Sequence, residues 1–363
     1  MEHPENDEKY AGLTVNSGVV QPPSVNPYLK KLKRKPIPTP AEMVERIIKG
    51  DVTMLSRAVT LVESINPEHE PIAQEVIEKC LPYSGNSRRI GITGVPGAGK
   101  STSIDVFGLH VLKDGGKLAV LAIDPSSERT KGSILGDKTR MEKLSVHPNA
   151  FIRPSPSAGS LGGVARKTRE TIVLCEAAGY NNIFVETVGV GQSETAVHSM
   201  VDFFLLIQLA GTGDELQGIK RGIMEMADGI VINKCDGDNI DRARLAQAQF
   251  RSALRLFPPT ASGFQPEVLT YSGYYEIGIP EVWEMIDRYF AFVKENGYFE
   301  RKRQEQARYW MYETIDTRLR NNFYNNPDVA DMLGDLEKQV LGNRLSSFIA
   351  AGKVLDFYYN KSK

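Results

Sequence analysis

The sequence predicts an α/β fold with a mostly parallel β-sheet flanked by helices. Between Arg89 and about Asn296, short apolar segments typical of strands alternate with longer segments of helical periodicity. Such alternation is typical of parallel strands joined by right-handed helical crossovers. A glycine-rich segment follows the first of these strands, and sheets of this kind bind ligands at the carboxyl ends of their strands. The predicted strands are residues 90–93, 118–123, 183–186, 203–208, 229–233 and 268–271.

Composition and charge exclude several classes of protein. Of 363 residues, 41% are hydrophobic and 25% are charged, which is close to the globular average and argues against whole-chain disorder. The 44 basic and 45 acidic residues nearly cancel, so we expect neither a nucleic acid nor a membrane as a partner. Three widely spaced cysteines without a C-x-x-C motif predict neither a disulfide framework nor a zinc site. These features favour a cytoplasmic protein.

The amino-terminal 84 residues predict an arm followed by helices. Residues 1–38 are rich in proline and mixed charge, and their early acidic residues argue against a targeting peptide, so we expect a flexible arm. Thr39, Pro40 and Glu42 then form a helix-start signal. Apolar residues follow at helical spacing, so residues 39–84 are predicted to form an amino-terminal helical domain.

The rest of the chain divides into two further predicted segments. Residues 85–296 would form the α/β domain, because they contain all the predicted strands. Residues 297–363 have helical periodicity, with a break at an Asn-Asn-Pro sequence. A helical tail of this length needs a surface to bury it. It therefore either folds over the sheet domain or packs against a second copy of the chain.

The glycine-rich segment matches the pattern G-x-x-x-x-G-K-[ST] and lies between the strand at 90–93 and a helical stretch at 102–112. Its glycines allow successive backbone N–H groups to surround phosphate oxygens, and the helix start adds partial positive charge. Lys100 is predicted to bridge the β- and γ-phosphates, and Ser101 to ligate Mg²⁺. The segment thus predicts a P-loop fold that binds a nucleoside triphosphate. The residues predicted to bind the nucleotide here are Gly94, Val95, Pro96, Gly97, Ala98, Gly99, Lys100, Ser101 and Thr102.

A second motif predicts that the base is guanine. Asn233, Lys234 and Asp236 form the pattern N-K-x-D at the carboxyl end of the strand at 229–233. A carboxylate at Asp236 can accept hydrogen bonds from N1–H and the 2-amino group of guanine, a pair of donors that adenine lacks. The stem of Lys234 can cover the base, and Asn233 can brace the loops. The loop predicted to close over guanine O6 consists of Ser272, Gly273 and Tyr274.

Four residues are predicted on the magnesium side of the nucleotide. Glu186 follows a predicted strand and is long enough to hold Mg²⁺ through water, while the Gly189 amide can sense the γ-phosphate. Asp124 and Asp137 lie in a segment that resembles a first switch region, although each could instead be a solvated loop acid. No glutamine directly follows Gly189, so the residue that positions the attacking water stays unassigned and slow intrinsic hydrolysis is expected.

Several motifs together resemble the MeaB/ArgK family, the methylmalonyl-CoA mutase-associated GTPases of the SIMIBI class of P-loop proteins. The resemblance covers roughly residues 40–320 and leaves out residues 1–38. The motifs that carry it are GVPGAGKST (94–102), LAIDPSS (121–127), GDKTRM (136–141), ETVGVGQSE (186–194) and GDELQGIK (213–220).

The resemblance implies a GTPase that forms GDP and phosphate and acts as a chaperone for an adenosylcobalamin-dependent acyl-CoA mutase. Such chaperones gate cofactor loading and protect or reactivate the mutase, and their carboxyl-terminal helices form a homodimer. Residues 211–222 correspond to the third switch of the family, in which Lys220 would reach the nucleotide when the mutase docks. The residues implied in phosphate handling, catalysis and the metal shell are Lys100, Ser101, Asp124, Asp137, Glu186 and Lys220.

Two other functions remain as alternatives. One is a metallochaperone-type GTPase for another metal- or cofactor-dependent enzyme, but the five histidines are scattered and form no cluster. The other is a nucleotide-dependent transport kinase, against which the guanine-selective Asp236 argues. A purely structural protein would not need both Lys100 and Glu186 in these positions.

Overall fold

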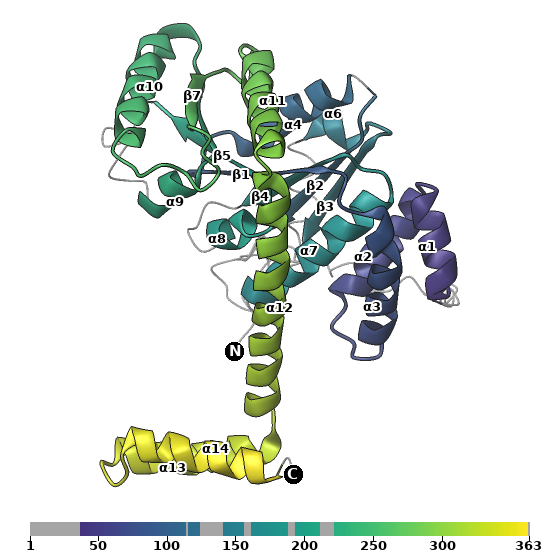
Figure 1. Cartoon of the computed structure of the whole chain (residues 1–363), viewed down its shortest axis with the longest axis vertical. Helices are drawn as coiled ribbons and strands as arrows, with labels where there is room; N and C mark the ends of the chain where they lie inside the picture. The colour runs from purple at the N-terminus through teal and green to yellow at the C-terminus, as the bar shows by residue number, and fades with distance from the viewer. Residues whose placement is uncertain are drawn as a thin grey trace, which may run out of the picture. The chain divides into compact units, whose positions relative to one another are not determined.

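The computed structural model describes residues 37–113, 115–123, 141–155, 161–187, 193–210 and 221–361. One compact unit begins at Pro40 and runs to the end of the chain. Its described part contains a sheet of seven strands in the order β3-β2-β4-β1-β5-β6-β7. Every neighbouring pair is parallel, so the predicted α/β fold is confirmed (Figure 1). The strands are β1 (Arg88–Gly94), β2 (Leu118–Ile123), β3 (Ala150–Ser155), β4 (Asn182–Thr187), β5 (Phe203–Leu209), β6 (Gly229–Asn233) and β7 (Glu267–Thr270).

Strand β3 was missed by the sequence analysis. It pairs with β2 alone, in a register that opposes Leu118 to Ala150 and Ile123 to Ser155. The strand contains Arg153 and Pro154, which interrupt the apolar pattern expected of a buried parallel strand. Proline is tolerated there because β3 lies at the edge of the sheet, where one row of backbone groups needs no partner strand.

Both faces of the sheet are buried, as is usual for parallel sheets. All six residues of β2 are buried, and they alternate between two hydrophobic clusters. Ala119 and Leu121 belong to the cluster on one face, whereas Leu118 and Val120 belong to the cluster on the other. The face of Leu118 is covered by α4 (Lys100–Leu112) and α11 (Ile279–Glu295).

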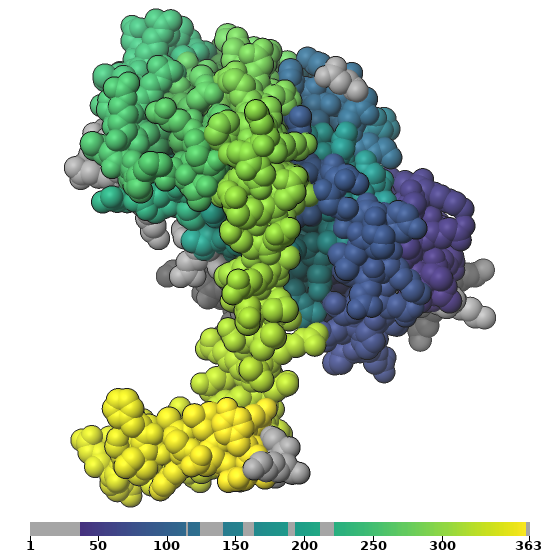
Figure 2. Space-filling model, viewed as in Figure 1, coloured from purple at the N-terminus to yellow at the C-terminus, as the bar shows by residue number. Residues whose placement is uncertain are grey.

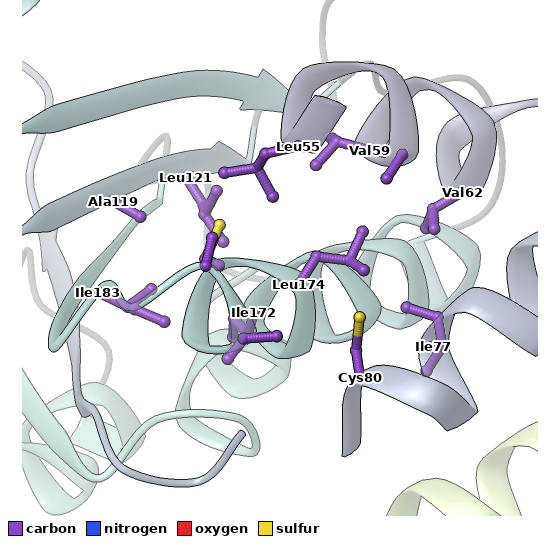
Figure 3. Close-up of a cluster of buried hydrophobic side chains, with 14 of the residues drawn as sticks. Leu55, Val59, Val62, Ile77, Cys80, Ala119, Leu121, Ile172, Leu174 and Ile183 are labelled. Atoms are coloured by element: carbon purple, nitrogen blue, oxygen red, sulfur yellow. The ribbon is translucent and has the colours of Figure 1, made fainter. Parts of the chain in front are cut away.

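The face of Leu121 is covered by α7 (Leu161–Ala177), on which the amino-terminal helices pack in turn. These are α1 (Pro40–Ile48), α2 (Val52–Glu63) and α3 (His69–Cys80). In Figure 3, side chains of α2 and α3 meet Leu174 of α7, and Leu121 of β2 lies on the sheet side of the same cluster. The amino-terminal helices therefore share one hydrophobic core with the sheet.

The chain ends in three helices, α12 (Tyr298–Tyr324), α13 (Pro327–Leu341) and α14 (Ser347–Lys361). Trp310 in the first half of α12 belongs to the core shared by the sheet and the amino-terminal helices. The last turns of α12 instead contribute Phe323 to a small separate cluster with α13 and α14. Figure 2 shows α13 and α14, coloured yellow, packed at the end of α12. Across the described ranges, no helix combines the length and the apolar character needed to cross a membrane.

The remaining described segments connect these elements. They include two short helices, α8 (Ser193–His198) and α9 (Arg221–Met226), which lie in the segments that follow β4 and β5. α10 (Ile240–Leu254) follows β6. The other elements are α6 (Glu142–Ser145) and the single turns η3 (Leu81–Tyr83) and η4 (Gly237–Asn239).

Candidate nucleotide site

The P-loop segment connects the central strand β1 to α4. Because β1 lies between β4 and β5, the loop emerges at the middle of the carboxyl edge of the sheet. Gly97 and Gly99 have φ angles of +81° and +86°, in the left-handed region that favours glycine. A Cβ atom at Gly97 would meet no atom within 4 Å, so the loop is open there and can receive a phosphate group. A Cβ atom at Gly99 would lie only 2.6 Å from the Asn233 amide nitrogen.

Lys100 extends over this loop. Its Nζ donates to the Gly94 carbonyl at 2.9 Å and to the Val95 carbonyl at 3.4 Å. Burial lowers the pKa of Lys100, and the negative charges of Glu186 and Glu194 act in the opposite direction. A partly desolvated ammonium group is stabilised by a nearby anion, so this position fits a phosphate.

Ser101 and Glu186 meet beside the loop. The Ser101 hydroxyl lies 3.4 Å from Glu186 Oε1, because Glu186 near the end of β4 is in register with Ile92 of β1. A hydroxyl and a carboxylate are hard oxygen donors of the kind that Mg²⁺ prefers, so the pair fits this ion. Among the described residues, no group of three or more His, Cys, Asp or Glu side chains is placed to hold a metal ion. The other predicted residues on this side lie outside the described ranges: Asp124, Asp137, Gly189 and Lys220.

Asn233 joins the phosphate loop to the loops predicted to hold the base. Its Nδ2 donates to the Ala98 carbonyl at 2.7 Å. Its Oδ1 accepts from the Lys234 amide at 2.7 Å and from the Gly273 amide at 3.0 Å. The side chain is only 3% exposed, so its polar atoms depend on these partners. One amide therefore fixes the spacing between three loops.

Asp236 is oriented by Ser272. The Ser272 hydroxyl donates to Asp236 Oδ2 at 2.6 Å, and the neighbouring Cys235 amide donates to the Tyr271 carbonyl at 3.0 Å. The two predicted base loops are thus bonded to each other. The side chain of Tyr274 is 81% exposed and lies edge-to-face with Tyr275, at the rim of this arrangement.

Three further residues, which were not predicted from the sequence, support the site. The buried Tyr271 hydroxyl is hydrogen bonded to Ser103 at 2.5 Å, and the Ser103 hydroxyl donates to the Gly99 carbonyl at 2.7 Å. These bonds connect Tyr271, which directly follows β7, to the first turn of α4 and to the phosphate loop. Glu194, at the start of α8, is 1% exposed, and its charge acts on Lys100. Ser103 and Tyr271 lie outside the sequence motifs, whereas Glu194 is the last residue of the ETVGVGQSE motif, to which the sequence assigned no role at that position.

Comparison with known proteins places these features in a family. Residues 55–328 match the family model described as methylmalonyl Co-A mutase-associated GTPase MeaB. The chain belongs to the MeaB family. The resemblance identified from the sequence is therefore confirmed, and so is the prediction that this MeaB-family member is a GTPase that binds guanine nucleotides.

Similar proteins occur in bacteria and animals. The MeaB-family chain is 47% identical to the GTPase ArgK of Escherichia coli, with 80% of this chain and 88% of ArgK aligned. It is 43% identical to the mitochondrial methylmalonic aciduria type A homolog of Mus musculus, over 87% and 78% of the two chains. A crystal structure of an LAO/AO transport system kinase has a TM-score of 0.72 and 38% identity, covering 88% of this chain and 97% of the other.

Proposed function

We propose that this MeaB-family GTPase is a chaperone for an adenosylcobalamin-dependent acyl-CoA mutase, with methylmalonyl-CoA mutase as the first candidate. It would use GTP to gate cofactor loading and to protect or reactivate the mutase. The observation that carries the proposal is the match of residues 55–328 to a family described by its association with methylmalonyl-CoA mutase. The P-loop, the Ser101–Glu186 pair and the hydrogen bond between Ser272 and Asp236 all lie within residues 55–328.

In this proposal, backbone groups and side chains of the phosphate loop bind different parts of the nucleotide and its metal ion. Backbone N–H groups of the phosphate loop would hold the phosphates, and Lys100, whose Nζ donates to the Gly94 carbonyl, would stabilise negative charge that develops between the β- and γ-phosphates. Ser101, Glu186, Asp124 and Asp137 would hold Mg²⁺, which neutralises phosphate charge when it is bound. Gly189 would sense the γ-phosphate, and Lys220 would approach the nucleotide when the mutase docks.

The base would be held by the second half of the site. Asp236 accepts from N1–H and the 2-amino group of guanine, with its carboxylate already oriented by Ser272. Lys234, Gly273 and Tyr274 would line the base. Because the chain has a formal net charge of −1, we expect neither nucleic acid nor membrane as a partner. Its three widely spaced cysteines, which form no C-x-x-C motif, favour action in the cytoplasm.

We expect the mutase to accelerate GTP hydrolysis at least about fivefold, the lower end of typical coupling between two binding partners. The reason is that the water-positioning group would be completed by docking. The measurement is the rate of phosphate release at saturating GTP, with and without purified methylmalonyl-CoA mutase. An acyl-CoA enzyme that lacks cobalamin serves as the control protein. Equal rates with the mutase and with the control would argue against the mutase as client.

The same assay separates a second candidate function. The similar solved structure is described as a transport system kinase, which transfers phosphate to an acceptor. A chaperone GTPase releases the γ-phosphate of GTP as inorganic phosphate, whereas a kinase leaves it on another molecule. Recovery of labelled γ-phosphate on a protein or small acceptor would favour the kinase. A metallochaperone-type GTPase would instead respond to a different client enzyme.

We also propose a homodimer held by α13 and α14. These helices share a cluster of four buried apolar residues in the described structure, which leaves large apolar side chains uncovered. Clustered exposed apolar surface is typical of an interaction site. The large exposed apolar residues of the two helices are Leu341, Phe348, Ile349, Leu355 and Tyr359.

Truncation after Asn326 is expected to convert the dimer into a monomer. This end point removes α13 and α14 but retains α12, whose Gln306 and Trp310 are buried against the rest of the chain. Sedimentation equilibrium of the full chain and the truncated chain measures the effect. GTP affinity should be unchanged and shows that the truncated chain is folded. A truncated chain that still sediments as a dimer would place the interface elsewhere.

A further inference from the structure

Helix α12 is hydrogen bonded to the turn that joins α8 to β5. This turn comprises residues 199–202, and three of its backbone carbonyls accept bonds from three side chains of α12. We call Lys302, Gln306 and Trp310 the carbonyl ladder. The bonds run from Lys302 Nζ to the Asp202 oxygen at 2.8 Å, from Gln306 Nε2 to the Val201 oxygen at 2.8 Å, and from Trp310 Nε1 to the Ser199 oxygen at 3.1 Å.

The ladder residues lie on one stripe of α12. They recur every four residues, a spacing that places side chains on the same face of a helix. They are 8%, 6% and 7% exposed, whereas Gln304 and Glu305 between them are exposed. Burying a lysine and a glutamine is unfavourable unless their polar atoms are hydrogen bonded. The hydrogen bonds therefore fix which residue of α12 lies opposite which carbonyl of the turn.

Arg303 strengthens the attachment at the same turn. Its guanidinium donates to both oxygens of the Asp202 carboxylate, at 2.8 Å and 2.7 Å, and to the Ser87 carbonyl at 2.7 Å. Gln306, in contrast, is held at one end. Within the described ranges its Oε1 is buried and has no hydrogen-bond partner. Of the three ladder side chains, Gln306 therefore has one polar atom held by a hydrogen bond and one that is not.

Helix α8 depends on outside contacts to keep its position. It has six residues, and isolated helices of this length are unstable. The last carbonyls of a helix, and those of the turn beyond it, have no partner within the helix. At this end the ladder supplies partners for Ser199, Val201 and Asp202.

At its other end α8 reaches the nucleotide site. It begins at Ser193, shortly after the strand that carries Glu186, and it packs against β1 and β4. Its second residue, Glu194, is buried, and its negative charge acts to raise the pKa of Lys100. A shift of α8 would therefore move a carboxylate relative to the phosphate loop.

We propose that the carbonyl ladder of α12 positions α8, and through it Glu194 and the end of β4, for GTP hydrolysis. Lys302, Gln306 and Trp310 are then positioning residues for a reaction that they do not touch. The proposal also makes α12 a route by which a protein bound to the carboxyl-terminal helices can change the hydrolysis rate.

The first test replaces Gln306 with methionine, which keeps the length of the side chain and removes its N–H donor. We expect kcat for GTP hydrolysis to fall about three- to tenfold, the kinetic equivalent of one lost hydrogen bond. The KM and Kd for GTP should stay within about twofold, because the phosphate and base loops are untouched. The matched control is Gln304→Met, the same change on the exposed side of α12, which should retain the wild-type kcat.

A merely structural role would change the melting temperature and the fraction of active protein, but not kcat per active site. Wild-type kcat in folded Gln306→Met would therefore overturn the proposal. If that variant does not fold, hydrogen exchange on the unaltered full chain decides the question. Peptides covering 298–312 should exchange at least about threefold more slowly with GDP and aluminium fluoride, a mimic of the hydrolysis transition state, than with a non-hydrolysable GTP analogue, because a contact that raises kcat without changing Kd is strengthened in the transition state. Equal exchange in the two states would also overturn it.

Discussion

Replacement of Lys100 with alanine is expected to reduce kcat for GTP hydrolysis at least about 100-fold, the usual cost of removing one charged donor from a transition state. The ammonium group lies over the phosphate loop, where the Gly94 carbonyl holds it at 2.9 Å. Its partial burial strengthens any interaction with developing negative charge, because less water screens it. Phosphate release in a single turnover, with a saturating excess of protein over GTP, measures the chemical step.

Lys113→Ala is a matched control for this experiment. Lys113 lies at the carboxyl end of the same helix, α4, and is exposed. Both variants should melt within a few degrees of the natural chain, since neither lysine fills a hydrophobic core. Hydrolysis by Lys100→Ala at the rate of Lys113→Ala would show that phosphate chemistry occurs elsewhere.

Replacement of Asp236 with asparagine is expected to weaken GTP binding on the order of 100-fold, because a charged hydrogen-bond pair is lost. Asparagine can still accept the 2.6 Å bond from Ser272 through its oxygen. Its amide nitrogen then faces position 2 of the base and cannot accept from the 2-amino donor of guanine. Xanthine has a carbonyl at position 2, so the variant should gain affinity for xanthosine triphosphate.

Competition binding with GTP, xanthosine triphosphate and ATP measures this change of preference. Asp238→Asn is the control, because Asp238 is exposed and lies two residues further along the chain. It removes the same charge without changing the predicted base contact. An Asp236→Asn variant that prefers guanine as strongly as the Asp238→Asn control would assign base recognition to another residue.

Local patterns in the sequence predict much of this fold and part of its site. Strands such as β2 are continuous apolar runs, and the phosphate and guanine motifs are short segments whose chemistry can be read directly. Strand β3 is different, since Arg153 and Pro154 interrupt its pattern and its position depends on pairing with β2. An edge strand of that kind is specified by its partner more than by its own residues.

Bonds between distant residues are the other part that sequence patterns do not reveal. Asn233 and Ala98 are 135 residues apart, and Ser103 and Tyr271 are 168 apart. Each pair joins loops whose approach is set by the order of strands in the sheet. The carbonyl ladder could not be predicted from the sequence for a further reason. Two of its three buried side chains, Lys302 and Gln306, are polar, so hydrophobic periodicity does not mark the face of α12 that packs against the turn at 199–202.

The length of α12 gives its attachment a mechanical consequence. The helix continues without interruption for 14 residues beyond Trp310, to Tyr324, which is roughly 21 Å at 1.5 Å per residue. A tilt of about 10° at Trp310 would displace Tyr324 by about 4 Å over that length. The helix would thus act as a lever, in which a sub-ångström adjustment beside the buried turn is magnified at the apolar surfaces of α13 and α14.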